Sequence, residues 1–143
     1  MTAGVAYAKV EKTFAMIKPD AVKTKVAGKI ISMIEENDFE ITAIKKMTFT
    51  KSDAETFYSV HKGKPFFDGL VEFMTSGPIF AIALERDNAI AEWRKLMGAT
   101  NHLEAAEGTV RKLYATSIRH NAVHGSDAEE TAKEELKQIF PDL

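Results

Sequence analysis

An apolar run in the middle of the chain, Ile79-Phe80-Ala81-Ile82-Ala83-Leu84, decides the fold. Apolar and polar residues do not alternate in it, and it is bounded by Pro78 and by the charged residues that follow Leu84. A strand that is buried on both faces has this pattern. The run therefore predicts a strand covered on both sides.

Three other stretches predict the remaining strands of the sheet. Residues 13–17 form a short apolar run that Pro19 ends, and residues 39–49 begin with an alternation of apolar and polar side chains. Both patterns are typical of strands. Residues 114–121 predict the last strand, so four strands are expected in all.

Helices are expected between these strands. Val26, Ile30 and Ile34 recur at helical spacing and predict a helix that ends near residue 37, and a further helix is expected from Pro65 to about residue 76. Capping residues predict the starts of three more helices: the pairs Ser52 with Glu55 and Ser126 with Glu129, and the single residue Asp87. Residues 98–113 predict a long loop.

The resulting order is β-α-β-α-α-β-α-loop-β-α. This order predicts an α/β chain of the α+β sandwich type: a ferredoxin-like βαββαβ fold with a four-stranded antiparallel sheet and extra helices. The length of 143 residues fits one domain over residues 1–143, with residues 1–11 expected as a flexible or edge N-terminal segment. Such a fold does not by itself assign an activity.

Composition excludes several classes of protein. Hydrophobic residues make up 45% of the chain and charged residues 28%, which excludes disordered and collagen-like chains. The net charge of −2 gives no overall attraction to nucleic acid or to an anionic membrane. The chain contains no cysteine, and its N-terminal stretch lacks a signal-peptide pattern, so a cytoplasmic location is expected.

The histidines offer two kinds of site. The chain has no Walker, dinucleotide-binding or HExxH motif. His120 and His124 lie four residues apart, a spacing that would suit a zinc site on a helix, but the segment is expected as a strand and shows no obvious third ligand. His124 lies instead between the last expected strand and the helix expected at Ser126, where helix N–H groups favour an anion. From the residues alone, His124 could be a base, a nucleophile or a buried hydrogen-bonding residue.

Residues 121–127, Asn-Ala-Val-His-Gly-Ser-Asp, match in full the N-x-x-H-[GA]-S-D signature of the nucleoside diphosphate kinases. The chain resembles this family along nearly its whole length. Further segments agree in the same order, namely residues 13–22, 64–70, 76–78, 97–101 and 107–111.

The resemblance implies that the γ-phosphoryl group of a nucleoside triphosphate passes to a nucleoside diphosphate by a ping-pong route through a phosphohistidine. It implies that His124 is the nucleophile and that Glu135 orients its imidazole. Lys18, Asn121 and Tyr58 complete the catalytic set that the resemblance implies.

The same resemblance implies a nucleotide site with low base specificity. Lys18, Arg94 and Arg111 would meet the phosphate charge, since phosphoryl transfer depends mainly on positioning and electrostatics. The remaining residues implied for the nucleotide are Thr100 and Tyr58 near the phosphates, Asn121 and Lys18 near the ribose, and Phe66 as the aromatic on which the base stacks, with Leu70 and Ile118 beside it. Stacking on Phe66 uses a face that every base has.

The family further implies Mg²⁺ as cofactor, bound through the nucleotide phosphates with no dedicated protein site, and a homo-oligomer, either a tetramer or a hexamer. The partners expected are nucleoside di- and triphosphates, with no membrane and no obligate nucleic acid. Two departures from the family pattern, His102 and the stretch Lys112-Leu113-Tyr114, affect the expected long loop.

Two alternatives to the enzyme stay open at this point. One is a ferredoxin-like module that binds nucleotide or RNA without catalysis, against which the slightly acidic charge and the lack of an RNP1-type run argue. The other is a catalytically silent relative, against which the intact set around His124 argues.

Overall fold

The computed structural model describes residues 10–143. The strands are β1 (Val10–Ile17), β2 (Glu40–Met47), β3 (Ile79–Asp87) and β4 (Val123–Gly125). The helices are α2 (Pro19–Lys23), α3 (Ala27–Glu36), α4 (Lys51–Phe57), α5 (Phe67–Met74), α6 (Ala89–Met97), α7 (Val110–Tyr114) and α8 (Glu129–Ile139), with a 3₁₀ turn η1 (Ser59–His61) after α4. Most of the N-terminal segment expected over residues 1–11 lies outside the described residues, and Val10 and Glu11 begin β1.

The four strands form one antiparallel sheet in the order β2-β3-β1-β4. This order is that of the ferredoxin-like plan, in which the two β-α-β crossovers interleave. The predicted fold class is therefore confirmed. At the edge of the sheet, β4 pairs with the end of β1, so that His124 lies opposite Met16.

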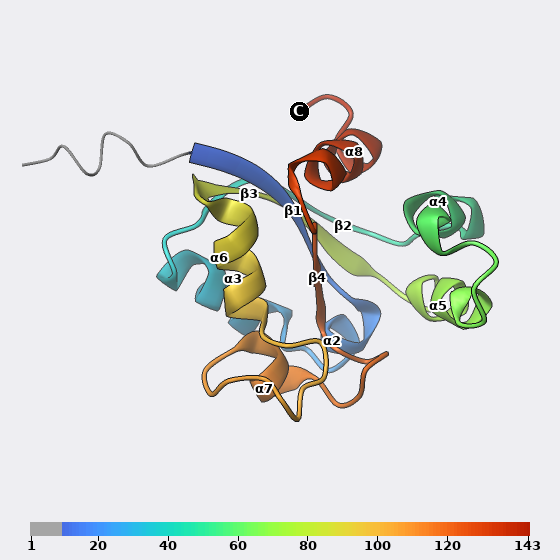
Figure 1. Cartoon of the computed structure of the whole chain (residues 1–143), viewed down its shortest axis with the longest axis horizontal. Coiled ribbons are helices and arrows are strands. Elements are labelled where there is room, and N and C mark those ends of the chain that lie inside the picture. Colours follow the sequence, from blue (N-terminus) through green and yellow to red (C-terminus); the bar gives the residue numbers. More distant parts are fainter. Residues whose placement is uncertain (1–9) are drawn as a thin grey trace, which may run out of the picture.

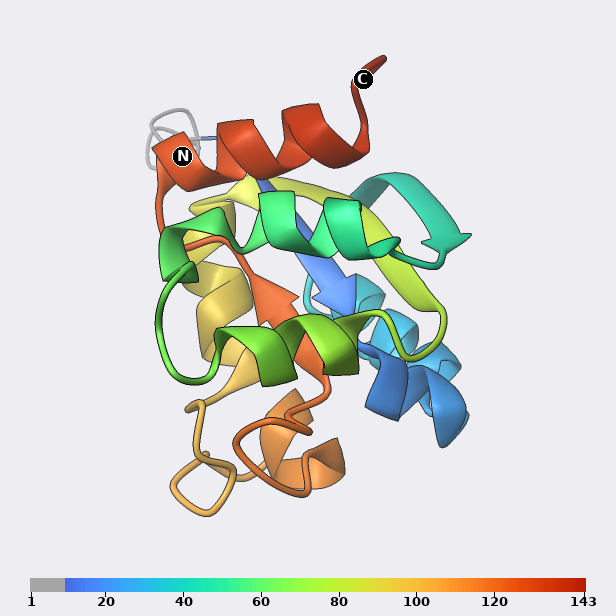
Figure 2. The same cartoon turned by 90° about the vertical axis from the view of Figure 1, so that its right-hand side faces the viewer.

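Helices cover both faces of the sheet (Figure 1). On one face α3 and α6 pack over residues of β1 and β3 such as Ile17 and Ile82. On the other face α4, α5 and α8 pack over Phe14 and Met16, and Figure 2 shows these three helices side by side in front of the strands. Burial on both faces explains the unbroken apolar run of β3, whose residues 81–84 are all fully buried.

The expected caps were wrong in three helices. α4 begins two residues earlier than expected, because Thr50 and Asp53 form the capping box in place of Ser52 and Glu55. Asp87 ends β3 and does not cap α6, whose first turn is held by the Glu11 carboxylate, which accepts the backbone N–H of Ile90 at 2.8 Å. The partner here comes from another strand, and sequence spacing within a helix cannot show it.

The third correction concerns α8, which begins at Glu129 after the N-cap residue Ala128. The Thr131 hydroxyl accepts the backbone N–H of Ala128 at 3.0 Å, so Ser126 and Glu129 form no capping box. Ser126 is buried, and its hydroxyl is used inside the protein.

The last strand was also predicted in the wrong place. Residues 114–121 end α7 and then form an irregular loop, closed by a hydrogen bond from Thr116 N–H to the His120 carbonyl, and the strand is Val123–Gly125. Ile118 is 65% exposed, so the β-branched residues of this stretch have no core to pack against. Strand formation depends on pairing and packing, and β1 supplies both only to residues 123–125.

Candidate active site

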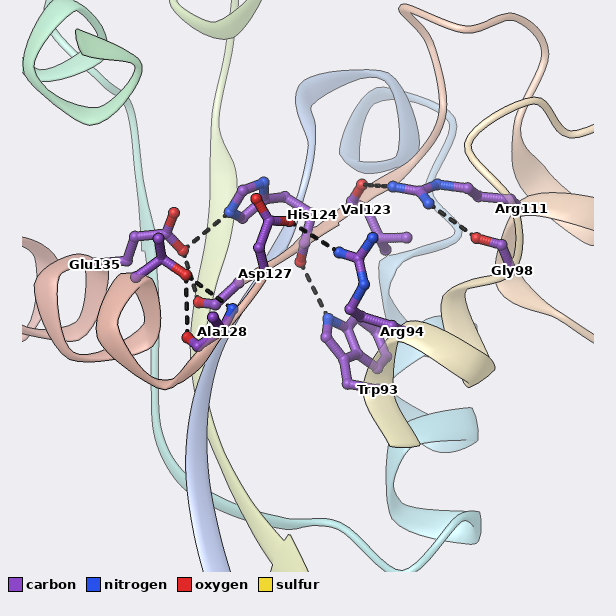
Figure 3. Close-up of polar contacts among 11 residues, drawn as sticks. Trp93, Arg94, Gly98, Arg111, Val123, His124, Asp127, Ala128 and Glu135 are labelled. Atoms are coloured by element: carbon purple, nitrogen blue, oxygen red, sulfur yellow. Dashed lines mark hydrogen bonds and ion pairs between the residues drawn. The ribbon is translucent and has the colours of Figure 1, made fainter. Parts of the chain in front are cut away.

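His124 is held on three sides by the fold. Its backbone is part of β4, and its carbonyl accepts a hydrogen bond from the Trp93 indole of α6 at 3.1 Å (Figure 3). The imidazole packs edge-on against Phe57, with 5.2 Å between the ring centres, and near Phe14 and Tyr58. These contacts fix the plane of the ring and leave the side chain 20% exposed.

Glu135, one and a half turns into α8, binds the imidazole. Its Oε1 lies 3.1 Å from His124 Nε2 and also accepts the Ser126 hydroxyl at 2.7 Å. An ionised carboxylate can only accept, so Nε2 carries the proton of the neutral ring and Nδ1 carries the lone pair. The contact therefore leaves Nδ1 as the nitrogen with an available lone pair.

Gly125 lets α6 come close to this strand. A Cβ at position 125 would lie 2.5 Å from Trp93 Cδ1 and 2.7 Å from Met97 Cε. Because Trp93 is fully buried, it has no room to move aside. The glycine beside the histidine is therefore required for the Trp93 contact with the His124 carbonyl.

A cavity of about 820 Å³ opens in front of the imidazole. It is lined by six of the residues that the sequence singled out, namely Tyr58, Arg94, Thr100, Arg111, His124 and Glu135. The Tyr58 hydroxyl is buried and has no hydrogen-bond partner among residues 10–143. Burial, with the nearby Glu135 charge second, raises the pKa of Tyr58, so the phenol stays protonated and can donate to a ligand.

Two arginines give the cavity a positive wall. Arg94, on α6, is half exposed and pairs with the exposed Asp127 at 3.1 Å. Arg111, on α7, is buried and donates to the carbonyls of Gly98 and Val123, both at 2.9 Å (Figure 3). Burial, and then the charge of Arg94, lower the pKa of Arg111 to about 10, which leaves it charged at neutral pH.

Lys18 and Asn121 form a buried pair next to this wall. Lys18 Nζ donates to Asn121 Oδ1 at 2.9 Å, and the side chain of Arg111 reaches the Asn121 carbonyl at 3.3 Å. Burial first, and then the charge of Arg111, lower the pKa of Lys18 to about 8, while Asp20 acts in the opposite direction. Lys18 is therefore mostly charged at pH 7.

The three residues expected at the base do not line the cavity of His124. Phe66, the residue before α5, is 43% exposed, and its ring lies 5.2 Å from that of His61, which does line the cavity. Ile118 is exposed on the loop after α7, and Leu70 is partly buried one turn into α5. The loop and α5 lie against each other, since a Cβ at Gly69 would meet the Arg119 guanidinium at 2.6 Å. Phe66 and Ile118 thus belong to two segments in contact.

Comparison with known proteins identifies the family. The sequence profile named "Nucleoside diphosphate kinase" matches residues 11–143. The chain belongs to the nucleoside diphosphate kinase family. Nucleoside diphosphate kinases of Oleidesulfovibrio alaskensis and Persephonella marina are 55% and 52% identical over 91% and 94% of this chain, and over 94% and 96% of their own sequences.

Solved structures agree with this assignment. The nucleoside diphosphate kinase of Aquifex aeolicus superposes with a TM-score of 0.91 at 41% identity, covering 92% of this chain and 96% of its own. That of Halobacterium salinarum, solved in complex with CDP, gives 0.90 at 40% identity and covers 94% and 90%. Transfer of phosphoryl groups between nucleotides is the activity of this family, so the predicted enzyme class is confirmed. Within the part of the chain that the structure describes, no helix has the length and apolarity to cross a membrane.

Among residues 10–143 no three His, Asp, Glu or Cys side chains gather as a metal site, and His120 contacts Ser117 and the Phe73 ring. Mg²⁺ often keeps several waters and binds substrate phosphates. The cavity wall has two exposed carboxylates, Asp127 and Glu134, and Asp127 is paired with Arg94.

Three polar contacts of this site had not been foreseen. Ser126 was expected to cap a helix and binds Glu135, and Asp127 pairs with Arg94. Asp20 accepts the backbone N–H of Ala122 at 3.1 Å. All three lie in segments that carry the family resemblance, but their partners are 9, 33 and 102 residues away, so only the folded chain shows what they contact.

Proposed function

We propose that this chain passes the γ-phosphoryl group of a nucleoside triphosphate to a nucleoside diphosphate through a phosphohistidine at Nδ1 of His124. The observation that carries the proposal is the contact of Glu135 with Nε2, which leaves Nδ1 as the free nitrogen of a side chain that lines the cavity. Each nucleotide would use the same cavity in turn, which is a ping-pong route.

In the first half-reaction the Nδ1 lone pair attacks the γ-phosphorus. The N–P bond forms while the bond from phosphorus to the β,γ-bridging oxygen breaks, and the leaving diphosphate takes the electron pair. The ring then carries a positive charge, which the Glu135 carboxylate stabilises through the Nε2 proton. In the second half-reaction a terminal oxygen of the acceptor diphosphate attacks the same phosphorus, and the pair of the N–P bond returns to Nδ1.

The transferring group carries negative charge throughout, and the fixed donors around it are the main source of rate acceleration. Arg94 and Arg111 in the wall would bind the phosphates. Thr100 would assist them, as would the Tyr58 hydroxyl, which has no hydrogen-bond partner among residues 10–143. Asp127 would release Arg94 when a phosphate competes for it, because the pair is exposed and therefore weak. Lys18 and Asn121, already hydrogen-bonded to each other, would reach the ribose hydroxyls and the phosphates.

The nucleoside would extend from the cavity past His61 toward Phe66, with Leu70 and Ile118 beside the base. The half-exposed ring of Phe66 supports this assignment, since a core phenylalanine would be buried. The Halobacterium salinarum relative was solved with a nucleoside diphosphate, CDP. Stacking without base-edge hydrogen bonds predicts low base specificity.

Mg²⁺ would enter with the nucleotide and neutralise part of the phosphate charge. Its ligands would be the phosphate oxygens and waters, with Asp127 as an outer contact. We further propose a homo-oligomer, a tetramer or a hexamer, which light scattering would distinguish. A cytoplasmic location stays a prediction of the sequence, to be tested by cell fractionation.

The test is to incubate the protein with γ-labelled ATP and Mg²⁺ and to follow label on the chain. We expect label that is labile in acid and stable in base, and we expect His124→Ala to abolish it. His120→Ala, which alters a histidine bound to Ser117 on the loop, is the matched control and should label normally. Label that persists in His124→Ala would refute the proposal, whereas binding of nucleotide without any label would favour a non-catalytic module.

A further inference from the structure

Two residues before His124 the backbone makes an uncommon turn. Ala122 has a φ of +71°, a value that residues with a Cβ rarely adopt. The Val123 N–H donates to the Asn121 carbonyl at 2.8 Å, which closes a three-residue γ-turn with Ala122 at its centre. The form of this turn with positive φ is rare and strained. Strain of this kind persists only where neighbouring groups enforce it.

Two residues at the start of α2, Lys18 and Asp20, hold both polar backbone groups of Ala122. The Lys18 N–H donates to the Ala122 carbonyl at 2.8 Å, and Asp20 Oδ2 accepts the Ala122 N–H at 3.1 Å. Ala122 is fully buried, so its N–H depends on a protein acceptor. Asp20 thus holds the turn through the Ala122 N–H, while the backbone of Lys18 holds it through the Ala122 carbonyl.

The turn connects two parts of the site. On one side, Asn121 presents its side chain to Lys18 Nζ at 2.9 Å. On the other side, Val123 and His124 enter β4 and pair with β1. If the turn relaxed, the Asn121 side chain and the imidazole would shift relative to each other.

The negative charge of Asp20 also acts on the pKa of Lys18. The charged groups that act on Lys18 are Arg111 from α7, Arg119 from the loop before Asn121, and Asp20 from α2. The two arginines and burial disfavour the ammonium form, and Asp20 favours it. Asp20 Oδ1 is buried with no donor among residues 10–143, so this oxygen has no hydrogen bond to offset its charge.

We propose that Asp20 is a positioning residue for phosphoryl transfer: its carboxylate holds Ala122 in the left-handed turn that aligns Asn121 with His124. The charge of Asp20 also favours the ammonium form of Lys18. The inference rests on the proposed function of His124. A simpler role, an acidic residue in the first turn of the short helix α2, would affect folding stability alone.

The test compares Asp20→Ala with Asp20→Asn. The alanine loses the acceptor for the Ala122 N–H, and we expect kcat to fall by about 10- to 100-fold, the effect of a small misplacement of reacting groups. The asparagine keeps an acceptor oxygen but loses the charge. At about pH 6.5, where Lys18 is charged in either case, Asp20→Asn should keep kcat within about threefold of the unmodified protein.

The pH dependence of kcat/KM separates positioning from stability. Lys18, with a pKa of about 8, should give a basic limb on which activity falls as pH rises. Without the Asp20 carboxylate the pKa of Lys18 drops further, so the limb should move to lower pH in Asp20→Asn. Asp87→Asn removes a carboxylate that pairs with Arg86 at the end of β3, and it should leave the limb in place.

Amide exchange of Ala122 gives a readout independent of activity. Its N–H should exchange slowly in the unmodified protein and in Asp20→Asn, and fast in Asp20→Ala. Unchanged kcat and exchange in Asp20→Ala, or an unmoved basic limb in Asp20→Asn, would overturn the inference. A failure of the proposed function would show differently, as an unmodified protein that takes no label on His124.

Discussion

At the scale of single residues, the chemistry of the site depends on which nitrogen of His124 is free. Glu135 Oε1 accepts two hydrogen bonds, from His124 Nε2 and from the Ser126 hydroxyl. The second bond fixes the carboxylate, which is only 18% exposed, in the orientation that the imidazole needs. In the proposed mechanism Ser126 would therefore act on the reaction through Glu135.

Glu135→Ala should lower the rate of phosphohistidine formation by about 100-fold, as when one fixed electrostatic partner of a transition state is removed. Ser126→Ala should lower it by about tenfold, the equivalent of one ordinary hydrogen bond. Stopped-flow measurement of the first half-reaction would give both rates. Glu130→Ala, an exposed carboxylate on the same helix, is the control and should have no effect. If Ser126→Ala lowered the rate of phosphohistidine formation more than Glu135→Ala, Ser126 would not act through Glu135.

At the scale of elements, the packing of α6 on β4 sets the position of the histidine. Trp93 reaches the His124 carbonyl only because position 125 has no side chain. The start of α6 also depends on a partner from elsewhere in the chain, because Glu11 of β1 holds its first turn.

Gly125→Ala should lower the free energy of unfolding by about 1–3 kcal/mol, the usual effect of inserting a methyl group into a full core. The new Cβ would lie 2.5 Å from Trp93 Cδ1, and α6 would have to move. Gly28→Ala is the matched control, because Gly28 lies in α3 and a Cβ added there would meet nothing within 4 Å. It should stabilise the protein by about 0.5–1 kcal/mol. Urea unfolding measures the free energy of unfolding of both variants. Equal midpoints would show that α6 is not closely packed against β4 at position 125.

At the scale of the whole molecule, the site is assembled from segments far apart in the chain. Lys18 and Asn121, which form one hydrogen bond, are 103 residues apart. The proposed base site would draw on two further segments, the start of α5 with Phe66 and the loop with Ile118, which meet where Arg119 lies on Gly69.

Phe66→Ala should therefore raise KM by about tenfold and by a similar factor for all nucleoside diphosphates, because each base loses one stacking face worth about 1–3 kcal/mol. The kcat should change little, since the substitution is remote from the imidazole. Steady-state kinetics with purine and pyrimidine diphosphates measure both constants. Phe73→Ala, a partly buried phenylalanine at the other end of α5, is a control for the helix itself. A loss confined to one base would mean that Phe66 contributes to base recognition by some means other than stacking.

Much of this protein could be predicted from local pattern. The unbroken apolar run of β3, the helical spacing of Ile30 and Ile34 in α3, and the ferredoxin-like order of elements follow from periodicity, because buried faces impose it on the sequence. The signature at residues 121–127 predicted the family, which the sequence profile confirms, while His124 as the nucleophile stays a prediction.

Only the tertiary structure decided the partners of those residues. It places the last strand at Val123–Gly125 and not at residues 114–121, because β1 pairs only with residues 123–125. It also shows that Ser126, expected as a helix cap, donates a hydrogen bond to Glu135. It also joined Asp20 to Ala122 across 102 positions. Periodicity reports how much of each element is buried, whereas a hydrogen bond between distant segments depends on how the elements pack, and no spacing along the chain encodes that.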